Sequence, residues 1–189
     1  MKRLALALIT AMLPIATPAE TLVYVGTNTG GDSQGIYVST FDETTGALSP
    51  PRLAAAIGNP GFLAMHPSKP WVYSVAGGKA ADGSWKDEVA AFAVQPDGSL
   101  ALLNTRPAGG NGPCHVSVDA SGRVLLLANY SGGNVVSYPI GADGSLGPAA
   151  STVQHEGSSV NPQRQKEPHP HGIYPDPTRT RAYVPDLGL

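Results

Sequence analysis

Short β-rich runs return along the chain as a set about every 50 residues, and this repeat constrains the fold more than any other feature. The segment MHPSKPWVYSVA at residues 65–76 aligns with VDASGRVLLLAN at 118–129 and with PDPTRTRAYVPD at 175–186. A turn that contains glycine also recurs, after the second strand-like run of each unit. It reads TGAL at 45–48 and DGSL at 97–100 and 143–146. Asp-Gly and Thr-Gly supply the positive φ that a tight hairpin turn needs. The repeat therefore predicts successive units of short antiparallel strands.

Seven runs in these units have the composition of strands and are bounded by Gly, Pro, Asn or Asp. They are residues 21–27, 35–41, 71–76, 88–94, 123–130, 134–140 and 181–186. No segment shows a sustained helical period. About four strands in each ~50 residues is the spacing of a propeller blade, whereas ankyrin and TPR units are shorter and helical. A β-sandwich has no reason to repeat a sequence unit. We therefore expect an all-β fold, a β-propeller.

The number of units raises the question of how a ring would close. Residues 20–189 hold three units and the start of a fourth, about three and a half blades, whereas propellers have about four to eight. An open half-ring would leave sheet faces and strand edges bare. We expect residues 20–189 to be the N-terminal part of a longer propeller that needs further C-terminal blades. Pairing of two such halves into one ring is the alternative.

Residues 1–19 have the composition of a secretory signal peptide. Lys2 and Arg3 precede an apolar run at 4–16, and TPA at 17–19 places small residues before a cleavage site. The run is shorter than the ~20 apolar residues that a membrane-spanning helix needs. We expect a periplasmic or secreted protein that has no membrane association once the signal is removed.

Charge and cysteine content exclude several classes of function. The formal charge is −2, and it would be −4 without Lys2 and Arg3, which argues against nucleic acid or an acidic membrane surface as a partner. Cys114 is the single cysteine, so no internal disulfide forms. We expect it to be a small buried apolar residue. A thiol mechanism with the adjacent His115 is disfavoured because neighbouring side chains in a strand point to opposite faces.

Several segments resemble one known family, most specifically PCHVSVD followed by GR and ANY, and QHEGSSVNPQRQ followed by PHPH and YVPDLGL. They are similar to the lactonase family of seven-bladed β-propellers, which includes propeller-type 6-phosphogluconolactonases and the fungal 3-carboxy-cis,cis-muconate cycloisomerase. The resemblance runs from about Thr21 to Leu189. It implies a ring of seven blades with a site at one mouth of the central channel. It implies no metal and no other cofactor.

Three histidines are the candidate catalytic residues. His169 and His171 are two residues apart, so in an extended segment their side chains face the same way. His115 has nearly the same place in the previous unit, on the strand expected to be innermost. Lactone hydrolysis needs a base for water and donors for the carbonyl oxygen, and histidine titrates near neutral pH. We expect His115 or His171 to be the base. The alternatives are a three-histidine metal site and histidines that bond the backbone of neighbouring blades.

Four further residues are candidates for substrate binding. Arg164 lies in the long connection at 154–171 and offers a planar fork to a carboxylate or phosphate, unless it is only a solvated loop charge. The resemblance points to His155. Asn129 and Asp186 end aligned strands, where they either line the channel or form turns.

Other polar and aromatic residues are expected to be structural. His66 aligns with the aspartates at 119 and 176, which precede strands, so we expect it in a turn. Trp71, Tyr73 and Tyr183 lie on strand patterns and are expected in blade cores.

Together these features predict hydrolysis of a sugar lactone. Because 6-phosphogluconolactone is a cytoplasmic intermediate, an exported enzyme would act on an unphosphorylated aldonolactone instead. A muconate-type cycloisomerase uses similar chemistry. An exported propeller that binds a ligand or protein without catalysis remains the alternative from a different class.

Overall fold

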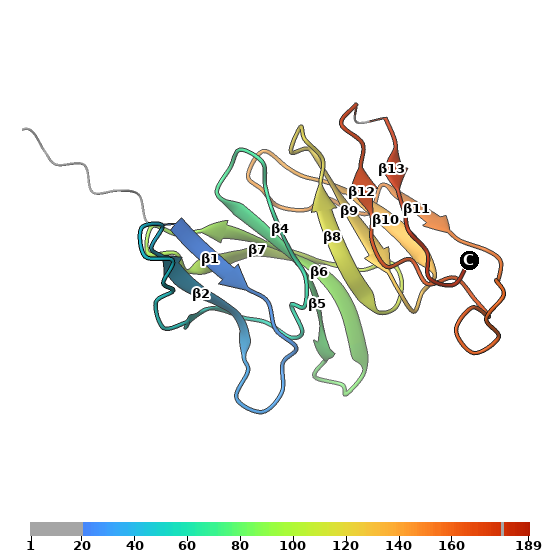
Figure 1. The fold of residues 1–189 in the computed structure, drawn as a ribbon, viewed down its shortest axis with the longest axis horizontal. Helices are drawn as coiled ribbons and strands as arrows, with labels where there is room; N and C mark the ends of the chain where they lie inside the picture. Colours follow the sequence, from blue (N-terminus) through green and yellow to red (C-terminus); the bar gives the residue numbers. More distant parts are fainter. Residues whose placement is uncertain (1–20, 179) are drawn as a thin grey trace, which may run out of the picture.

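The computed structural model describes residues 21–178 and 180–189, and every regular element in this part of the chain is a β-strand (Figure 1). The expected signal peptide, residues 1–19, lies outside the described residues. The described ranges contain no helix that is long and apolar enough to cross a membrane. The expected all-β class is confirmed.

Each sheet is an antiparallel meander of strands that follow one another in sequence, and we number these sheets as blades 1 to 4. Blade 1 contains β1 (Thr21–Val25), β2 (Gly35–Phe41) and β3 (Arg52–Ala56). Blade 2 contains β4 (Leu63–Met65), β5 (Trp71–Lys79), β6 (Trp85–Val94) and β7 (Leu100–Pro107). Blade 3 contains β8 (Pro113–Val118), β9 (Val124–Asn129), β10 (Asn134–Pro139) and β11 (Ser151–Gln154). Blade 4 contains β12 (Tyr174–Pro175) and β13 (Ala182–Tyr183).

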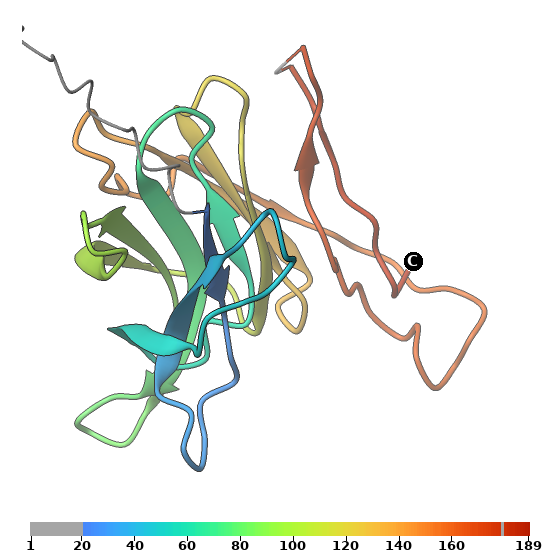
Figure 2. The same cartoon turned by 60° about the vertical axis from the view of Figure 1, so that its left-hand side comes forward.

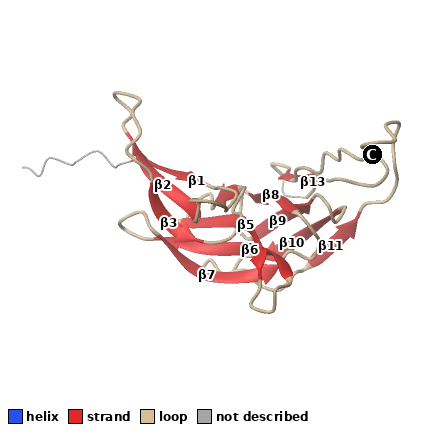
Figure 3. Cartoon of the chain, turned by 90° about the horizontal axis from the view of Figure 1, so that it is seen from below, coloured by secondary structure: helices blue, strands red, loops and turns tan. Residues whose placement is uncertain are grey.

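The sheets lie side by side along an arc, seen from below in Figure 3. Figure 2 shows the hairpin of β12 and β13 standing beside blade 3, with the loop that precedes it extending outward. The first strands of blades 2 and 3 contact each other across the boundary between the blades, as do those of blades 3 and 4. The arrangement is that of successive propeller blades, as the repeat predicts.

Apolar side chains from the facing sheets fill the space between blades. Tyr73 and Val75 of blade 2 pack with Val116, Leu125 and Leu127 of blade 3, and all five are buried. Two phenol groups also cross this boundary. The hydroxyl of Tyr73 donates to the carbonyl of Gly144 at 3.1 Å, and that of Tyr138 donates to the carbonyl of Pro107 at 2.7 Å. The interface between blades 2 and 3 is therefore both apolar and hydrogen-bonded.

Two aromatic residues depart from the expected burial. Tyr73 is buried as expected, but Trp71 is only half-buried. Tyr183 is 61% exposed, so its expected place in a blade core is wrong. The physical reason is that β13 pairs only with β12 and no other described strand covers that side.

The turn after the first strand repeats one hydrogen-bonding arrangement in blades 2 and 3. Asp119 accepts hydrogen bonds from the backbone N–H groups of Ser121, Arg123 and Val124. In blade 2, His66 Nδ1 accepts from the N–H groups of residues 68 and 69 in the same way. Because Nδ1 accepts, the proton of the neutral ring lies on Nε2, which faces the carbonyl of Gly122 at 3.0 Å. The expected turn role of His66 is confirmed, and its ring also ties blade 2 to blade 3.

The first strand of blade 3 contains an irregularity that the alignment does not reveal. Pairing of β8 with β9 shifts between Pro113 and His115, so Cys114 is an extra residue in a β-bulge. Both Cys114 and His115 then face blade 4, where Sγ lies 3.5 Å from the carbonyl of Pro170 and Nδ1 lies 3.3 Å from the N–H of Ile173. The expected alternation of these two side chains is therefore wrong.

Candidate active site

His115 occupies the boundary between three blades. It is only 5% exposed, and its ring centroid lies 4.2 Å from that of Phe62 and 4.8 Å from that of Tyr174. Phe62 directly precedes β4, and Tyr174 begins β12. Aromatic side chains of blades 2 and 4 therefore contact the imidazole ring from both neighbouring blades.

The hydrogen bond to His115 determines which ring nitrogen carries a proton. Nδ1 accepts from the N–H of Ile173, so the neutral ring carries its proton on Nε2. Burial lowers the pKa of His115, and His171 lowers it further whenever the His171 ring is protonated. His115 is therefore a neutral donor at pH 7. Of the two histidines expected as base, His115 is poorly suited because its Nδ1 lone pair is already occupied.

His169 and His171 share one aromatic neighbour, Tyr130, which follows β9. The ring of His169 stacks on Tyr130 with centroids 4.6 Å apart and an interplanar angle of 10°. The ring of His171 meets Tyr130 edge-on at 5.4 Å and 89°. Both side chains therefore lie near one residue, consistent with their predicted spacing on one side of an extended segment.

The two histidines differ in what their ring nitrogens contact. His169 Nδ1 lies 3.2 Å from the carbonyl oxygen of Tyr130, which can only accept, so Nδ1 carries the proton and Nε2 keeps its lone pair. His171 is exposed, and its ring makes no hydrogen bond to any described residue. His171 thus has a free lone pair on the solvent side of the cluster.

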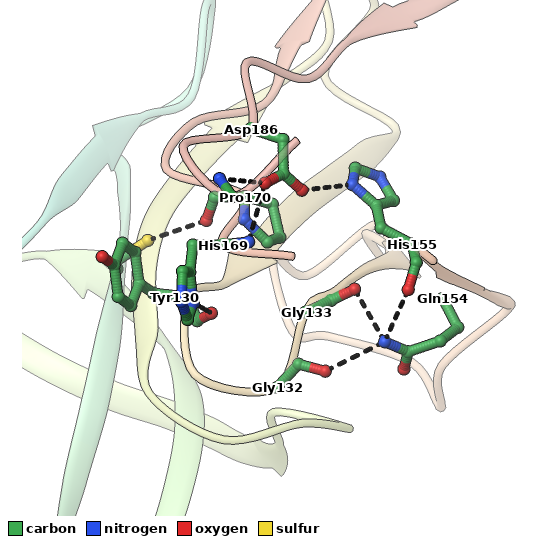
Figure 4. Close-up of polar contacts among 10 residues, drawn as sticks. Tyr130, Gly132, Gly133, Gln154, His155, His169, Pro170 and Asp186 are labelled. Carbon is green, nitrogen blue, oxygen red and sulfur yellow. Dashed lines mark hydrogen bonds and ion pairs between the residues drawn. The ribbon is translucent and has the colours of Figure 1, made fainter. Parts of the chain in front are cut away.

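Asp186 organises the segment that carries these histidines (Figure 4). One carboxylate oxygen accepts from the N–H groups of His169 at 2.7 Å and Gly188 at 2.8 Å. The other lies 2.7 Å from His155 Nδ1, and the carboxylate side chain is only 6% exposed. Burial alone would raise the pKa of Asp186, but the hydrogen bonds from His169, His155 and Gly188 outweigh burial and hold it below its usual value. His155 therefore keeps its proton on Nδ1.

Two predicted substrate-binding residues lie outside this cluster. Arg164 is exposed in a turn in which its N–H donates to the carbonyl of Asn161, and its guanidinium makes no hydrogen bond or ion pair within the described ranges. Asn129 is fully buried, and its Nδ2 donates to the carbonyl of Ala108 and to Oδ1 of Asn134, each at 2.9 Å. Asn129 has no surface to offer a substrate in this arrangement.

Cys114 is adjacent to the cluster but has the chemistry of a structural thiol. Its Sγ donates to the carbonyls of Ala128 at 3.6 Å and Pro170 at 3.5 Å. Burial raises the pKa of the Cys114 thiol, which keeps it protonated and unreactive at neutral pH. Residues 21–178 and 180–189 contain no group of three or more His, Cys, Asp or Glu placed to hold a metal ion, so the three-histidine metal alternative is not assembled.

An open pocket of about 630 Å³ borders the cluster at the end of the blades where the connections from one blade to the next run. It is lined by Asn28, Asn59, Gly61, Val75, Ala76, Gly77, Trp85, Asp87, Asn111, Gly112, Pro113, Cys114 and Ser131. Gly112 accepts the N–H of Tyr130, and Cys114 precedes His115, so the pocket wall continues directly into the histidine cluster.

Sequence reasoning missed the aromatic residues of this region, Phe62, Trp85, Tyr130 and Tyr174. A usable signal existed for Trp85. The stretch between the second and third strands, residues 77–87, is longer in its unit than the corresponding stretch at 130–133. An insertion between repeated strands is a common location for function.

Comparisons with known proteins agree on one family. A family profile described as "Lactonase, 7-bladed beta-propeller" matches residues 22–189. A 6-phosphogluconolactonase of Bacillus subtilis (strain 168) is 39% identical over 167 residues, which cover 88% of this chain and 46% of that protein. The chain thus spans about half the length of the curated relatives it matches.

Two solved structures have closely similar folds. A periplasmic gluconolactonase of Pseudomonas aeruginosa aligns with a TM-score of 0.80 at 31% identity, covering 90% of this chain and 48% of that one. A protein of Bacteroides fragilis aligns with a TM-score of 0.80 at 35% identity, covering 93% of this chain and 48% of its own.

Proposed function

Because the chain belongs to the lactonase family of seven-bladed β-propellers, we propose that the protein hydrolyses a sugar lactone at the histidine cluster between blades 3 and 4. The observation that carries the proposal is that two neighbouring histidines differ, since one can donate a hydrogen bond and the other can accept a proton. His115 presents an N–H donor, and His171 presents a free lone pair. The 6-phosphogluconolactonase relative of Bacillus subtilis supports lactone hydrolysis as the reaction class.

The two histidines can share the steps of the reaction. His171 accepts a proton from water, and the water oxygen forms a bond to the lactone carbonyl carbon. The negative charge that develops on the carbonyl oxygen is stabilised by His115 Nε2–H. When the ring C–O bond breaks, the leaving oxygen takes the proton back from His171, which yields the open-chain aldonic acid. His169 and Asp186 position the segment that carries the base.

We also propose that the substrate is unphosphorylated. The expected signal peptide at residues 1–19 would direct residues 20–189 out of the cytoplasm. Sugar phosphates are cytoplasmic intermediates, so an exported enzyme would rarely meet one. The similarity to a protein described as a periplasmic gluconolactonase supports the same substrate class. Arg164 stays a candidate for binding an anionic group from the loop.

The test uses the full-length gene product. Acid release from glucono-δ-lactone is followed against the spontaneous rate for the wild type and for His171→Ala. Loss of a general base should lower kcat by about 10²- to 10⁴-fold. The matched control is His66→Asp. Residue 66 follows β4, whereas Phe62, which contacts His115, precedes it. The substitution removes a histidine away from the cluster and introduces the residue type found in the aligned turn at Asp119.

Three outcomes are informative. Acceleration that is lost in His171→Ala and kept in His66→Asp supports the proposal. Acceleration that survives in His171→Ala removes this residue as the base. A folded wild type that does not accelerate the reaction contradicts the lactonase assignment and leaves a cycloisomerase or a binding propeller.

A further inference from the structure

The hairpin of β5 and β6 extends farther toward the pocket than its counterpart in the next blade. β5 has nine residues and pairs with β6 as far as Lys79 and Trp85, whereas β9 has six and its pairing with β10 ends at Asn129 and Asn134. In Figure 1 this hairpin projects beyond the ends of the neighbouring strands. The extension carries Trp85 and Asp87 to the pocket wall.

Trp85 is held in place although it is 58% exposed. Its Nε1 donates to Asp87 Oδ1 at 2.8 Å. A side-chain carbon built on Gly77 would lie 3.5 Å from the indole ring, so the indole packs against this glycine. An exposed indole that is fixed at one edge and supported by backbone loses little conformational entropy on binding a ligand.

Asp87 fixes the hairpin relative to the histidine side of the pocket. Its second carboxylate oxygen accepts the N–H of Gly112 at 2.8 Å, on the connection that leads into β8. The same connection places Cys114, and therefore the bulge that presents His115, on the pocket wall. The carboxylate of Asp87 thus links the indole of Trp85 to the connection that leads into β8, the strand that carries His115.

The pocket lining has the chemistry of a site for a neutral polyhydroxylated ring. The side chains of Asn28, Asn111 and Ser131 line it and make no hydrogen bond to any described residue, so they are available to hydroxyl groups. Its lining within the described ranges includes the carboxylate of Asp87 but no Lys or Arg. A phosphate group would meet this negative charge without a compensating cation. The volume, about 630 Å³, suits a small ligand.

We propose that this pocket binds the pyranose ring of an unphosphorylated aldonolactone, with the indole of Trp85 as the stacking surface and Asp87 selecting against phosphorylated substrates. The inference rests on the proposed lactonase function for its substrate class. Asp87 is a specificity residue here and takes no part in the bond-breaking steps.

Binding is tested with glucono-δ-lactam, a neutral analogue of the lactone that resists hydrolysis, by calorimetry on the full-length gene product. Trp85→Ala should raise the Kd about tenfold, which corresponds to about 1.4 kcal/mol. Trp85→Phe keeps an aromatic face and should stay within about threefold of the wild type. The control is Lys86→Ala, because the neighbouring side chain lies on the opposite face of β6 and lines a different groove. Equal affinity of Trp85→Ala and the wild type would overturn the proposal.

Specificity is tested by comparing kcat/KM for glucono-δ-lactone and for its 6-phosphate. The wild type should prefer the unphosphorylated lactone, and Asp87→Asn should reduce that preference about tenfold, mainly through KM. A preference for the phosphate, or one that Asp87→Asn leaves unchanged, contradicts the role of Asp87. Binding of the lactam without hydrolysis of the lactone would instead contradict the proposed function and leave the pocket assignment standing.

Discussion

The three histidines that are hydrogen-bonded at this site differ in which ring nitrogen carries the proton, because each bonds a different partner. His115 accepts at Nδ1, whereas His155 and His169 donate from it, to a carboxylate and to a carbonyl. In the neutral rings, the remaining nitrogen of His115 is therefore a donor, and the remaining nitrogens of the other two are acceptors. Residue type alone predicts a histidine site. The difference between the three rings depends on their partners, which are the N–H of Ile173, the carboxylate of Asp186 and the carbonyl of Tyr130.

Asp186 should stabilise the fold in a pH-dependent way. Asp186→Asn removes one acceptor oxygen from a buried network and should lower the free energy of unfolding by about 1–3 kcal/mol at pH 7. The pKa of Asp186 is lower in the folded chain than in the unfolded one, so its stabilisation is present above about pH 4 and is lost as pH falls through the folded value. Urea unfolding of both proteins between pH 3 and 7 should show their difference shrinking at low pH.

The control for this measurement is Asp32→Asn, which changes an exposed carboxylate that makes no hydrogen bond to a described residue. It should alter the unfolding free energy by less than about 0.5 kcal/mol. A difference between wild type and Asp186→Asn that is constant across the pH range would contradict an ionised network at Asp186.

At the residue scale, the sequence predicted the common side of His169 and His171 but not the surroundings of His115 or Asn129. The bulge at Cys114 changes the facing of side chains and depends on pairing with β9, which an alignment of repeats does not show. Asn129 aligns with Asp186, but its amide bonds Ala108 and Asn134 and contacts no histidine through a hydrogen bond. The glycine at 110 leaves room for its amide, since a side-chain carbon there would lie 2.7 Å from Asn129 Nδ2. Adjacent glycines before β8 were the available signal.

At the element scale, the repeated hairpin glycines have the same conformation but different surroundings. Gly46, Gly98 and Gly144 have φ values of 74°, 80° and 87°, as the Thr-Gly and Asp-Gly turns predict. Nothing lies within 4 Å of a side-chain carbon built on Gly46, whereas one on Gly144 would lie 2.5 Å from the ring of Trp71. Gly144 therefore allows the turn of blade 3 to pack on blade 2.

This difference predicts unequal costs for the same substitution. Gly46→Ala should lower the unfolding free energy by about 1 kcal/mol, from the positive φ alone. Gly144→Ala should lower it by roughly 2–4 kcal/mol, because the overlap with Trp71 adds to the backbone strain. Denaturant unfolding of the two variants provides the comparison. Equal losses would show that the contact between Trp71 and the turn contributes little.

The elements that sequence reasoning located best are the middle strands of blades 2 and 3. β5, β6, β9 and β10 are flanked by sheet on both sides and carry the apolar patterns that define a strand. The outermost strand β11 is exposed at all four residues, and β4 has only three residues. Such strands form because a neighbour offers hydrogen-bonding groups, so their own side chains carry little signal.

At the scale of the whole molecule, the repeat predicted the propeller because each blade needs a neighbour to bury its face. The apolar cluster between blades 1 and 2 and the one between blades 2 and 3 show this dependence directly. Hydrogen bonds from buried phenols could not be foreseen, because their partners are backbone carbonyls of the adjacent blade.

The phenols between blades 2 and 3 predict how the molecule unfolds in alkali. Burial raises the pKa of Tyr138 to about 12, and burial together with the charge of Asp143 raises the pKa of Tyr73 as well. A group whose folded pKa is raised stabilises the fold fully below its unfolded pKa, about 10, and less as pH rises through the folded value. For Tyr138 the difference corresponds to roughly 3 kcal/mol.

Blades 2 and 3 should therefore separate as these phenols ionise. Between about pH 10 and 12, tyrosinate absorbance and loss of tryptophan fluorescence should change together in the full-length gene product. Tyr138→Phe cannot ionise, so its unfolding free energy should fall less steeply with pH, although the lost hydrogen bond to Pro107 costs about 1 kcal/mol at pH 7. Tyr183→Phe, at an exposed position, should leave the alkaline midpoint unchanged. Complete ionisation of all tyrosines near pH 10 without unfolding would show that the boundary between blades 2 and 3 is open to water.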